Sequence, residues 1–146
     1  MNIFQFQDKI SKRLMRWSLL SIAVGLLMRF GGKFGKGLGI QFITWGLVDA
    51  AIAVGGQVAK RNRIDRMRNP GKPEIKQEEA NNLSRLLWIN AGLDVLYMIG
   101  GYLWAKRDKG DGSARGNGLG VIVQGLFLFV FDVFHARNMP KKHTED

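Results

Sequence analysis

The sequence predicts an all-α integral membrane protein, a four-helix bundle made of two helical hairpins that repeat in parallel. Three observations support this prediction. Long windows carry almost no charge, the 22 Lys and Arg residues gather between those windows, and the second and fourth windows share a polar pattern. A net charge of +10 would also suit a basic soluble protein. The distribution of charge, rather than its sum, therefore indicates a membrane domain over residues 1–146.

Four windows have the length needed to cross a bilayer, which takes about 20 mostly apolar residues. They predict spans at about residues 14–30, 37–58, 86–105 and 117–136. The last three contain no Lys or Arg, and their ionisable residues are Asp49, Asp94, Asp132 and, near the end of the fourth span, His135.

The first span is the weakest of the four. Its uninterrupted apolar run, Trp17 to Met28, reaches spanning length only if Arg16 and Arg29 extend to the headgroups. A cleaved signal peptide is the alternative, but the run ends without the small-residue pattern of a cleavage site, so we favour a retained helix. Residues 1–13 are amphipathic at helical spacing, which predicts a helix on the membrane surface or an extension of the span.

Residues 59–85 form a predicted basic cytoplasmic loop, interrupted by the run Asn69-Pro70-Gly71-Lys72-Pro73 and extended by helix on either side. Of the Lys and Arg residues, 15 lie in the N-terminal segment, this loop and the tail 137–146, against 7 on the opposite side. The positive-inside rule then places both termini in the cytoplasm. Four loop arginines are expected to bind anionic lipid headgroups rather than nucleic acid: Arg61, Arg63, Arg66 and Arg68.

An internal repeat relates the second and fourth spans. At an offset of 83 residues, four glycine or polar positions coincide: Gly35 with Gly118, Gly37 with Gly120, Gln41 with Gln124, and Asp49 with Asp132. Each half then crosses the membrane out and back, and the two halves share one orientation. The expected symmetry is a pseudo-twofold axis along the membrane normal, a parallel repeat rather than an inverted one.

The polar residues within the spans are the candidate functional residues, because an ionised carboxylate at mid-bilayer costs about 2.5 to 3.5 kcal/mol. We expect them to face one interior: Asp94, Asp132, Asp49, Gln124, Gln41 and Asn90. The acids should be protonated, hydrogen-bonded, or bound to a cation or water. Two interpretations stay open: a proton or cation pathway, and hydrogen-bonding groups that hold the helices together.

Several functions are disfavoured. The chain has no cysteine and two histidines, His135 and His143, so we expect no metal site and no cofactor, and the pairing of Asp132 with His135 is weak evidence for either. The glycine-rich segments at 31–39 and 110–120 match no nucleotide-binding fingerprint, and they are interpreted as turns and close helix contacts. No group of residues suggests hydrolysis, so the protein is not expected to be an enzyme.

Two segments carry a resemblance to a known family. The run Asn90-Ala91-Gly92-Leu93-Asp94-Val95, with Tyr97 and Gly100, is followed by Gly118-Leu119-Gly120 and by Gln124 to Leu128 with Asp132. Together they resemble the signature of an uncharacterised family of small bacterial four-span membrane proteins. The resemblance implies a bacterial inner membrane and no known activity. The first half matches more loosely through Trp45 and Asp49, where relatives more often carry Asn, which would make a charge at position 49 dispensable.

The sequence thus favours a small transporter or channel-like module for a proton, a cation or a small solute. The alternative is a structural or regulatory subunit that packs against lipid, another membrane protein or a second copy of itself. A cavity around the acids would discriminate between them.

Overall fold

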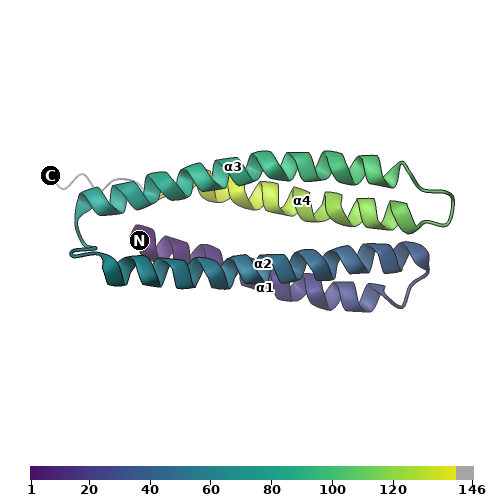
Figure 1. Cartoon of the computed structure of the whole chain (residues 1–146), viewed down its shortest axis with the longest axis horizontal. Helices are drawn as coiled ribbons and strands as arrows, with labels where there is room; N and C mark the ends of the chain where they lie inside the picture. Colours follow the sequence, from purple (N-terminus) through teal and green to yellow (C-terminus); the bar gives the residue numbers. More distant parts are fainter. Residues whose placement is uncertain (141–146) are drawn as a thin grey trace.

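The computed structural model describes residues 1–140, which form four α-helices and no strand (Figure 1). The helices are α1 (Ile3–Met28), α2 (Lys33–Arg66), α3 (Pro73–Ala105) and α4 (Ser113–Arg137). The predicted all-α four-helix bundle is therefore confirmed. Most of the expected tail 137–146, including His143, lies outside the described residues.

The helix starts follow from local sequence. Asn2 caps α1 by accepting a hydrogen bond from the backbone N–H of Gln5, whose side chain in turn accepts one from the backbone N–H of Asn2. Pro73 is the first residue of α3. A proline is tolerated there because the N–H group that it lacks would have no hydrogen-bond partner within the helix. Gly112 precedes α4 with a φ of +82°, a conformation that favours glycine.

Helices α2 and α3 are longer than the predicted spans. They contain 34 and 33 residues and are each about 50 Å long at 1.5 Å per residue. Most of the expected 59–85 loop is consequently helical, and the chain breaks only between Arg66 and Pro73. Helix α1 is likewise continuous from Ile3, so the amphipathic residues 1–13 extend the first helix.

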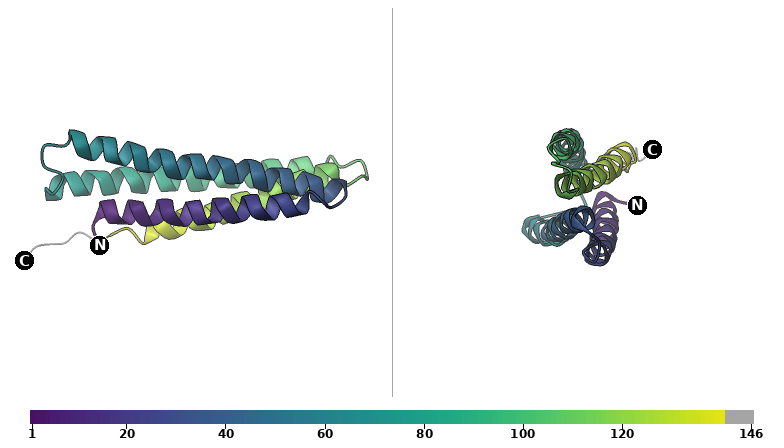
Figure 2. Two further views of the ribbon diagram at one scale, coloured as in Figure 1. Left: turned by 90° about the horizontal axis from the view of Figure 1, so that it is seen from below. Right: turned by 90° about the vertical axis from the view of Figure 1, so that its right-hand side faces the viewer.

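The bundle consists of two antiparallel hairpins laid side by side (Figures 1 and 2). Helix α1 packs along α2, α3 packs along α4, and α2 packs against α4 to join the hairpins. The N-terminus and the turn between α2 and α3 lie at one end, called here the N-terminal end. The two short hairpin turns lie together at the other, called the hairpin-turn end (Figure 1).

Glycines allow the helices of each hairpin to approach closely. A Cβ atom added to Gly25 in α1 would lie 2.6 Å from the carbonyl oxygen of Gly39 in α2, and one added to Gly101 in α3 would lie 2.7 Å from that of Gly118 in α4. Real Cβ atoms do not come this near to a backbone oxygen. Gly39 and Gly118, which belong to the glycine-rich segments predicted to form close helix contacts, therefore lie at helix crossings.

The outer surface is strongly apolar. Within the described residues, three helices are long and apolar enough to cross a membrane: α2, α3 and α4. Helix α1 falls short of that measure because Lys and Arg residues occupy its first half, in line with the weakness of the first predicted span. Large apolar side chains face outward on all four helices, among them Leu27, Ile52, Leu96 and Val130, each more than half exposed.

Candidate functional site

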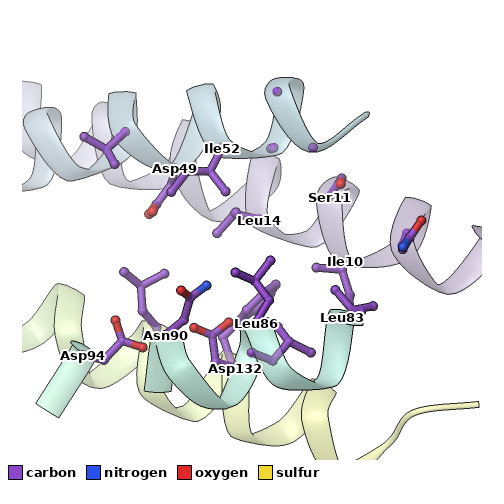
Figure 3. Close-up of a pocket in the computed structure, with 18 of the residues that line it drawn as sticks. Ile10, Ser11, Leu14, Asp49, Ile52, Leu83, Leu86, Asn90, Asp94 and Asp132 are labelled. Atoms are coloured by element: carbon purple, nitrogen blue, oxygen red, sulfur yellow. The ribbon is translucent and has the colours of Figure 1, made fainter. Parts of the chain in front are cut away.

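A cavity of about 510 Å³ lies between the two hairpins, on the N-terminal side of the bundle's middle (Figure 3). It is lined by side chains from all four helices. Its position follows from the packing, because the closest approaches of α2 to α4, at Gly37, Gly116 and Gly120, lie toward the hairpin-turn end, and α2 does not pack along α3. Most of its wall is apolar, with Ile52 of α2 and Leu86 and Leu93 of α3 among the lining residues.

Three carboxyl groups and one carboxamide meet in this cavity. Asp49 comes from α2, Asn90 and Asp94 from α3, and Asp132 from α4 (Figure 3). The three acids are almost fully enclosed, with exposed fractions of 0%, 3% and 7%. The carboxyls of Asp94 and Asp132 are close enough for one to hydrogen-bond the other, and Asp49 faces them from the opposite hairpin.

The acids have few partners within the protein. Among residues 1–140, neither carboxyl oxygen of Asp49 has a hydrogen-bond partner, and neither does Oδ2 of Asp94. A buried polar atom left unpaired costs about 1 to 3 kcal/mol. These oxygens are therefore available to a proton, a water molecule or a bound ligand in the cavity.

Two aromatic rings line the cavity beside the acids. Trp45 of α2 and Tyr97 of α3 lie with ring centroids 5.0 Å apart. Their contact joins the two hairpins across the side where α2 and α3 diverge. An indole or phenol face attracts cations, and it also packs against apolar groups.

The two glutamines predicted to share the interior lie elsewhere. Gln124 is fully buried in α4, accepts a hydrogen bond from Trp17 Nε1 at 3.1 Å and donates one to Ser21 Oγ at 3.1 Å. Gln41 donates to Asn117 Oδ1 at 2.8 Å, near the hairpin-turn end. Both glutamines thus bridge helices, and the structure brings four of the six candidate residues together.

A polar cluster that the sequence analysis missed lies at the N-terminal end of the cavity. Arg63 of α2 makes two hydrogen bonds of 3.1 Å to the buried carboxylate of Glu79 in α3. Gln7 of α1 donates to the same carboxylate at 3.2 Å. This pairing could have been predicted from the sequence, because arginines precede the proline-containing break and glutamates follow it. The other three arginines of the loop, Arg61, Arg66 and Arg68, are exposed, and so is Arg63 despite its pairing with Glu79.

The same end carries a second ion pair. Lys60 of α2 donates to the carboxylate of Asp8 in α1. The hydrogen bond from Lys60 is the largest of the effects that hold the pKa of Asp8 below its usual value. Both long helices are therefore tied to their neighbours by charged groups beyond the apolar segments.

His135 does not join the acids. One ring nitrogen, Nδ1, is 2.7 Å from the carbonyl oxygen of Phe131, and the other, Nε2, is 3.1 Å from the guanidinium of Arg13. Since both nitrogens have partners, the ring links α4 to α1 through hydrogen bonds. No group of three or more potential ligands suited to a metal ion occurs in the part of the chain that the structure describes.

The fold and the cavity define an all-α protein with three helices of membrane-spanning length and apolarity. The chain belongs to a family of unknown function (DUF6992), whose profile matches residues 13–133. The match covers the segments that carried the resemblance to an uncharacterised family. Neither the curated proteins nor the solved structures gave a significant match.

Proposed function

We propose that the protein is a non-enzymatic, multi-pass protein of a bacterial cytoplasmic membrane that moves a proton, a cation or a small solute through the cavity between its hairpins. Membrane insertion is supported by the three apolar helices and by the apolar side chains on the outer face. A water-soluble monomer rarely exposes so continuous an apolar surface. Charged residues at the two ends of the bundle are suited to the headgroup regions.

The proposed orientation has the N-terminal end in the cytoplasm. The excess of Lys and Arg at that end supports it. Arg61, Arg66 and Arg68, which are exposed there, would then be available to anionic headgroups.

Matching contacts support a parallel repeat of the two hairpins. Gly25 meets Gly39 and Ile43 in the first hairpin as Gly101 meets Gly118 and Ile122 in the second. One step along the bundle, Gly46 meets Ser18 and Ile22 as Gly125 meets Asp94 and Met98. The first helices then correspond at an offset of 76 residues and the second helices at 79, instead of the 83 that the polar pattern suggests.

This register makes the acid cluster unequal between the halves. Asp94 corresponds to Ser18, and Asp132 corresponds to Ala53. The first hairpin thus offers a hydroxyl and a methyl group where the second offers two carboxyls. A pathway that uses the acids would be asymmetric within a nearly symmetric scaffold.

The observation that carries the proposed activity is that buried carboxyl oxygens of Asp49 and Asp94 have no partner among residues 1–140 although both residues line a cavity. Gln124 illustrates the structural alternative, since its polar atoms are satisfied by side chains of a neighbouring helix. Asp49 and Asp94 differ, because each has at least one buried carboxyl oxygen without a partner among residues 1–140, and both residues line the cavity. Residues that serve packing alone would be expected to have all of their buried polar atoms paired.

Reconstitution into vesicles tests the proposal. Proteoliposomes that contain a pH-sensitive dye, or sodium or potassium indicators, should show ion flux under an imposed gradient. Asp94→Asn and Asp132→Asn should abolish that flux while the purified proteins keep their helical content and melting temperature. Asp65→Asn is the matched control, because it makes the same change on an exposed residue at the end of α2.

Two results would contradict the proposal. Flux that is absent from the wild type, with protons, sodium, potassium and a small organic cation each tested, would remove the transport function. Flux that survives in both variants would remove the acids from the pathway. Loss of the fold in both variants, or co-purification of a stable membrane partner together with an absence of flux, would favour the structural or regulatory alternative.

A further inference from the structure

The size and the lining of the cavity restrict what it can hold. At about 510 Å³ it falls in the range of small-molecule sites, roughly 300 to 1,000 Å³. A dehydrated inorganic ion would occupy only a small part of that space. The wall is mostly aliphatic, so water would gain few hydrogen bonds there, whereas an organic ligand would bury apolar surface.

The charges of the cavity select the sign of that ligand. Asp49, Asp94 and Asp132 are its acids, and Arg63 at its end is neutralised by Glu79. Asp49 is 0% exposed, and Figure 3 shows its side chain turned toward the space between the hairpins. A cationic ligand could satisfy its unpaired oxygens. The rings of Trp45 and Tyr97 offer further favourable surfaces to a positive charge.

The cavity also opens sideways. Several lining residues are accessible to solvent, namely Val48 (42%) and Ile52 (56%) of α2 and Leu86 (54%) and Leu93 (41%) of α3. They lie on either side of the gap where α2 and α3 diverge. In a bilayer this opening would face the acyl chains, so an apolar ligand could enter from the membrane.

From these features we infer that the cavity binds a lipophilic organic monocation, which enters from the bilayer between α2 and α3 and is held by the carboxyls of Asp49, Asp94 and Asp132. The inference rests on the proposed function, because it names the class of solute for the same site. It assigns the acids to binding a charge and the apolar walls to binding the body of the ligand.

Binding of radiolabelled tetraphenylphosphonium to the full-length protein in detergent tests the charge selection. Equilibrium dialysis should give saturable binding, and tetraphenylborate, with the same shape and the opposite charge, should not compete. Asp49→Asn, Asp94→Asn and Asp132→Asn should each weaken binding by about tenfold, a change of about 1.4 kcal/mol. Asp65→Asn should leave it unchanged.

A pair of glycine variants tests the side opening. Gly55 lines the cavity on α2, and Gly92 lies on α3 outside the lining. A Cβ atom at either position meets nothing within 4 Å, so both sites accept the first atom of a side chain without a clash. Gly55→Leu should narrow the opening and weaken or slow binding of tetraphenylphosphonium, whereas Gly92→Leu should not.

The outcomes separate this inference from the proposed function. Absence of saturable tetraphenylphosphonium binding, or equal competition by tetraphenylborate, would overturn the inference. Proton or metal-ion flux that depends on Asp94 and Asp132 would, in that case, leave the proposed function intact. Binding that all three Asp→Asn variants retain at full strength would also overturn it, because the cation would then bind elsewhere. Equal effects of Gly55→Leu and Gly92→Leu would remove the entry route.

Discussion

Gly25 and Gly39 cross so closely that a Cβ atom on either would lie 2.6 Å from the carbonyl oxygen of the other. The backbones of α1 and α2 are therefore in direct contact at this point, and a side chain on either residue must push them apart. Because the same kind of contact joins Gly101 to Gly118, both hairpins depend on the absence of a side chain where their helices cross.

We expect Gly25→Ala to lower the stability of the first hairpin despite the better helix propensity of alanine. The added methyl group would also lie 2.8 Å from Cγ1 of Ile43, so backbone and side chain must both move. Overpacking of this kind costs about 1 to 3 kcal/mol. Thermal unfolding of the purified protein, followed by circular dichroism, would measure the change.

Gly92→Ala is the matched control for that experiment. Its Cβ atom meets nothing within 4 Å, so alanine should be neutral or slightly stabilising there. Equal melting temperatures for Gly25→Ala and Gly92→Ala would show that the crossing of α1 and α2 is looser than described.

A second prediction concerns Gln124, which links α4 to α1 through Trp17 and Ser21. Gln124→Leu keeps a similar volume but leaves the indole N–H and the serine hydroxyl without this partner. The expected loss is about 1 to 3 kcal/mol of unfolding free energy.

Either change alone, Gln124→Leu or Ser21→Ala, breaks the hydrogen bond between Gln124 and Ser21. The double variant Gln124→Leu with Ser21→Ala should therefore lose less unfolding free energy than the sum of the two single changes, because the shared bond is lost only once. Strict additivity in chemical or thermal unfolding would contradict the link.

The helices were largely predictable because their signals are local. The windows without Lys or Arg predicted the apolar segments of α2, α3 and α4, and the proline-containing break predicted where α2 ends and α3 begins. The length of α2 and α3 beyond those windows was less accessible, since charged residues there are compatible with either a solvated helix or a loop. For residues 1–13 the amphipathic pattern left two alternatives, and packing against the bundle decides for an extension of α1.

The site was only partly predictable, because it depends on how the helices are rotated and shifted relative to one another. Asp49, Asp94 and Asp132 were singled out by their burial cost alone. Gln41 and Gln124 repeat at the same spacing from an acid, yet each bonds to a different neighbouring helix. Identity of polar residues suggested an offset of 83, whereas backbone contacts at glycines support 79, about one helical turn away.

A third prediction concerns Asp108 in the turn between α3 and α4. Burial by itself would raise the pKa of its carboxyl, but hydrogen bonds from the backbone N–H groups of Arg115, Gly110 and Gly112, together with one from the Arg115 guanidinium, outweigh that effect and lower it. A lowered pKa in the folded state stabilises the fold above the unfolded value, about 3.9, and the contribution is lost as the pH falls through the folded value.

Asp108→Asn should therefore lower the melting temperature at pH 7, since asparagine offers one acceptor oxygen and no charge to these N–H groups. The difference from the wild type should begin to shrink below about pH 3.9, where the carboxyl of the unfolded chain takes up a proton, and should be smallest below the lowered pKa of the folded carboxyl. Asp65→Asn, at an exposed position, should show no such pattern. A gap between Asp108→Asn and the wild type that stays constant from pH 7 to pH 3 would show that the charge is not what stabilises the turn.

The last prediction concerns the orientation of the bundle in the membrane. The chain has no cysteine, so single cysteines can be introduced without removing native ones. Gly32→Cys and Lys109→Cys place a thiol in the two turns at the hairpin-turn end, while Gly71→Cys places one in the turn at the opposite end. The excess of Lys and Arg at the N-terminal end predicts that this end faces the cytoplasm. A membrane-impermeant maleimide should then label Gly32→Cys and Lys109→Cys in intact bacterial spheroplasts, and should label Gly71→Cys only after lysis. Labelling of Gly71→Cys alone in intact spheroplasts would reverse the orientation. Quantitative labelling of all three in a soluble cell fraction would show that the apolar outer face serves protein association instead of insertion.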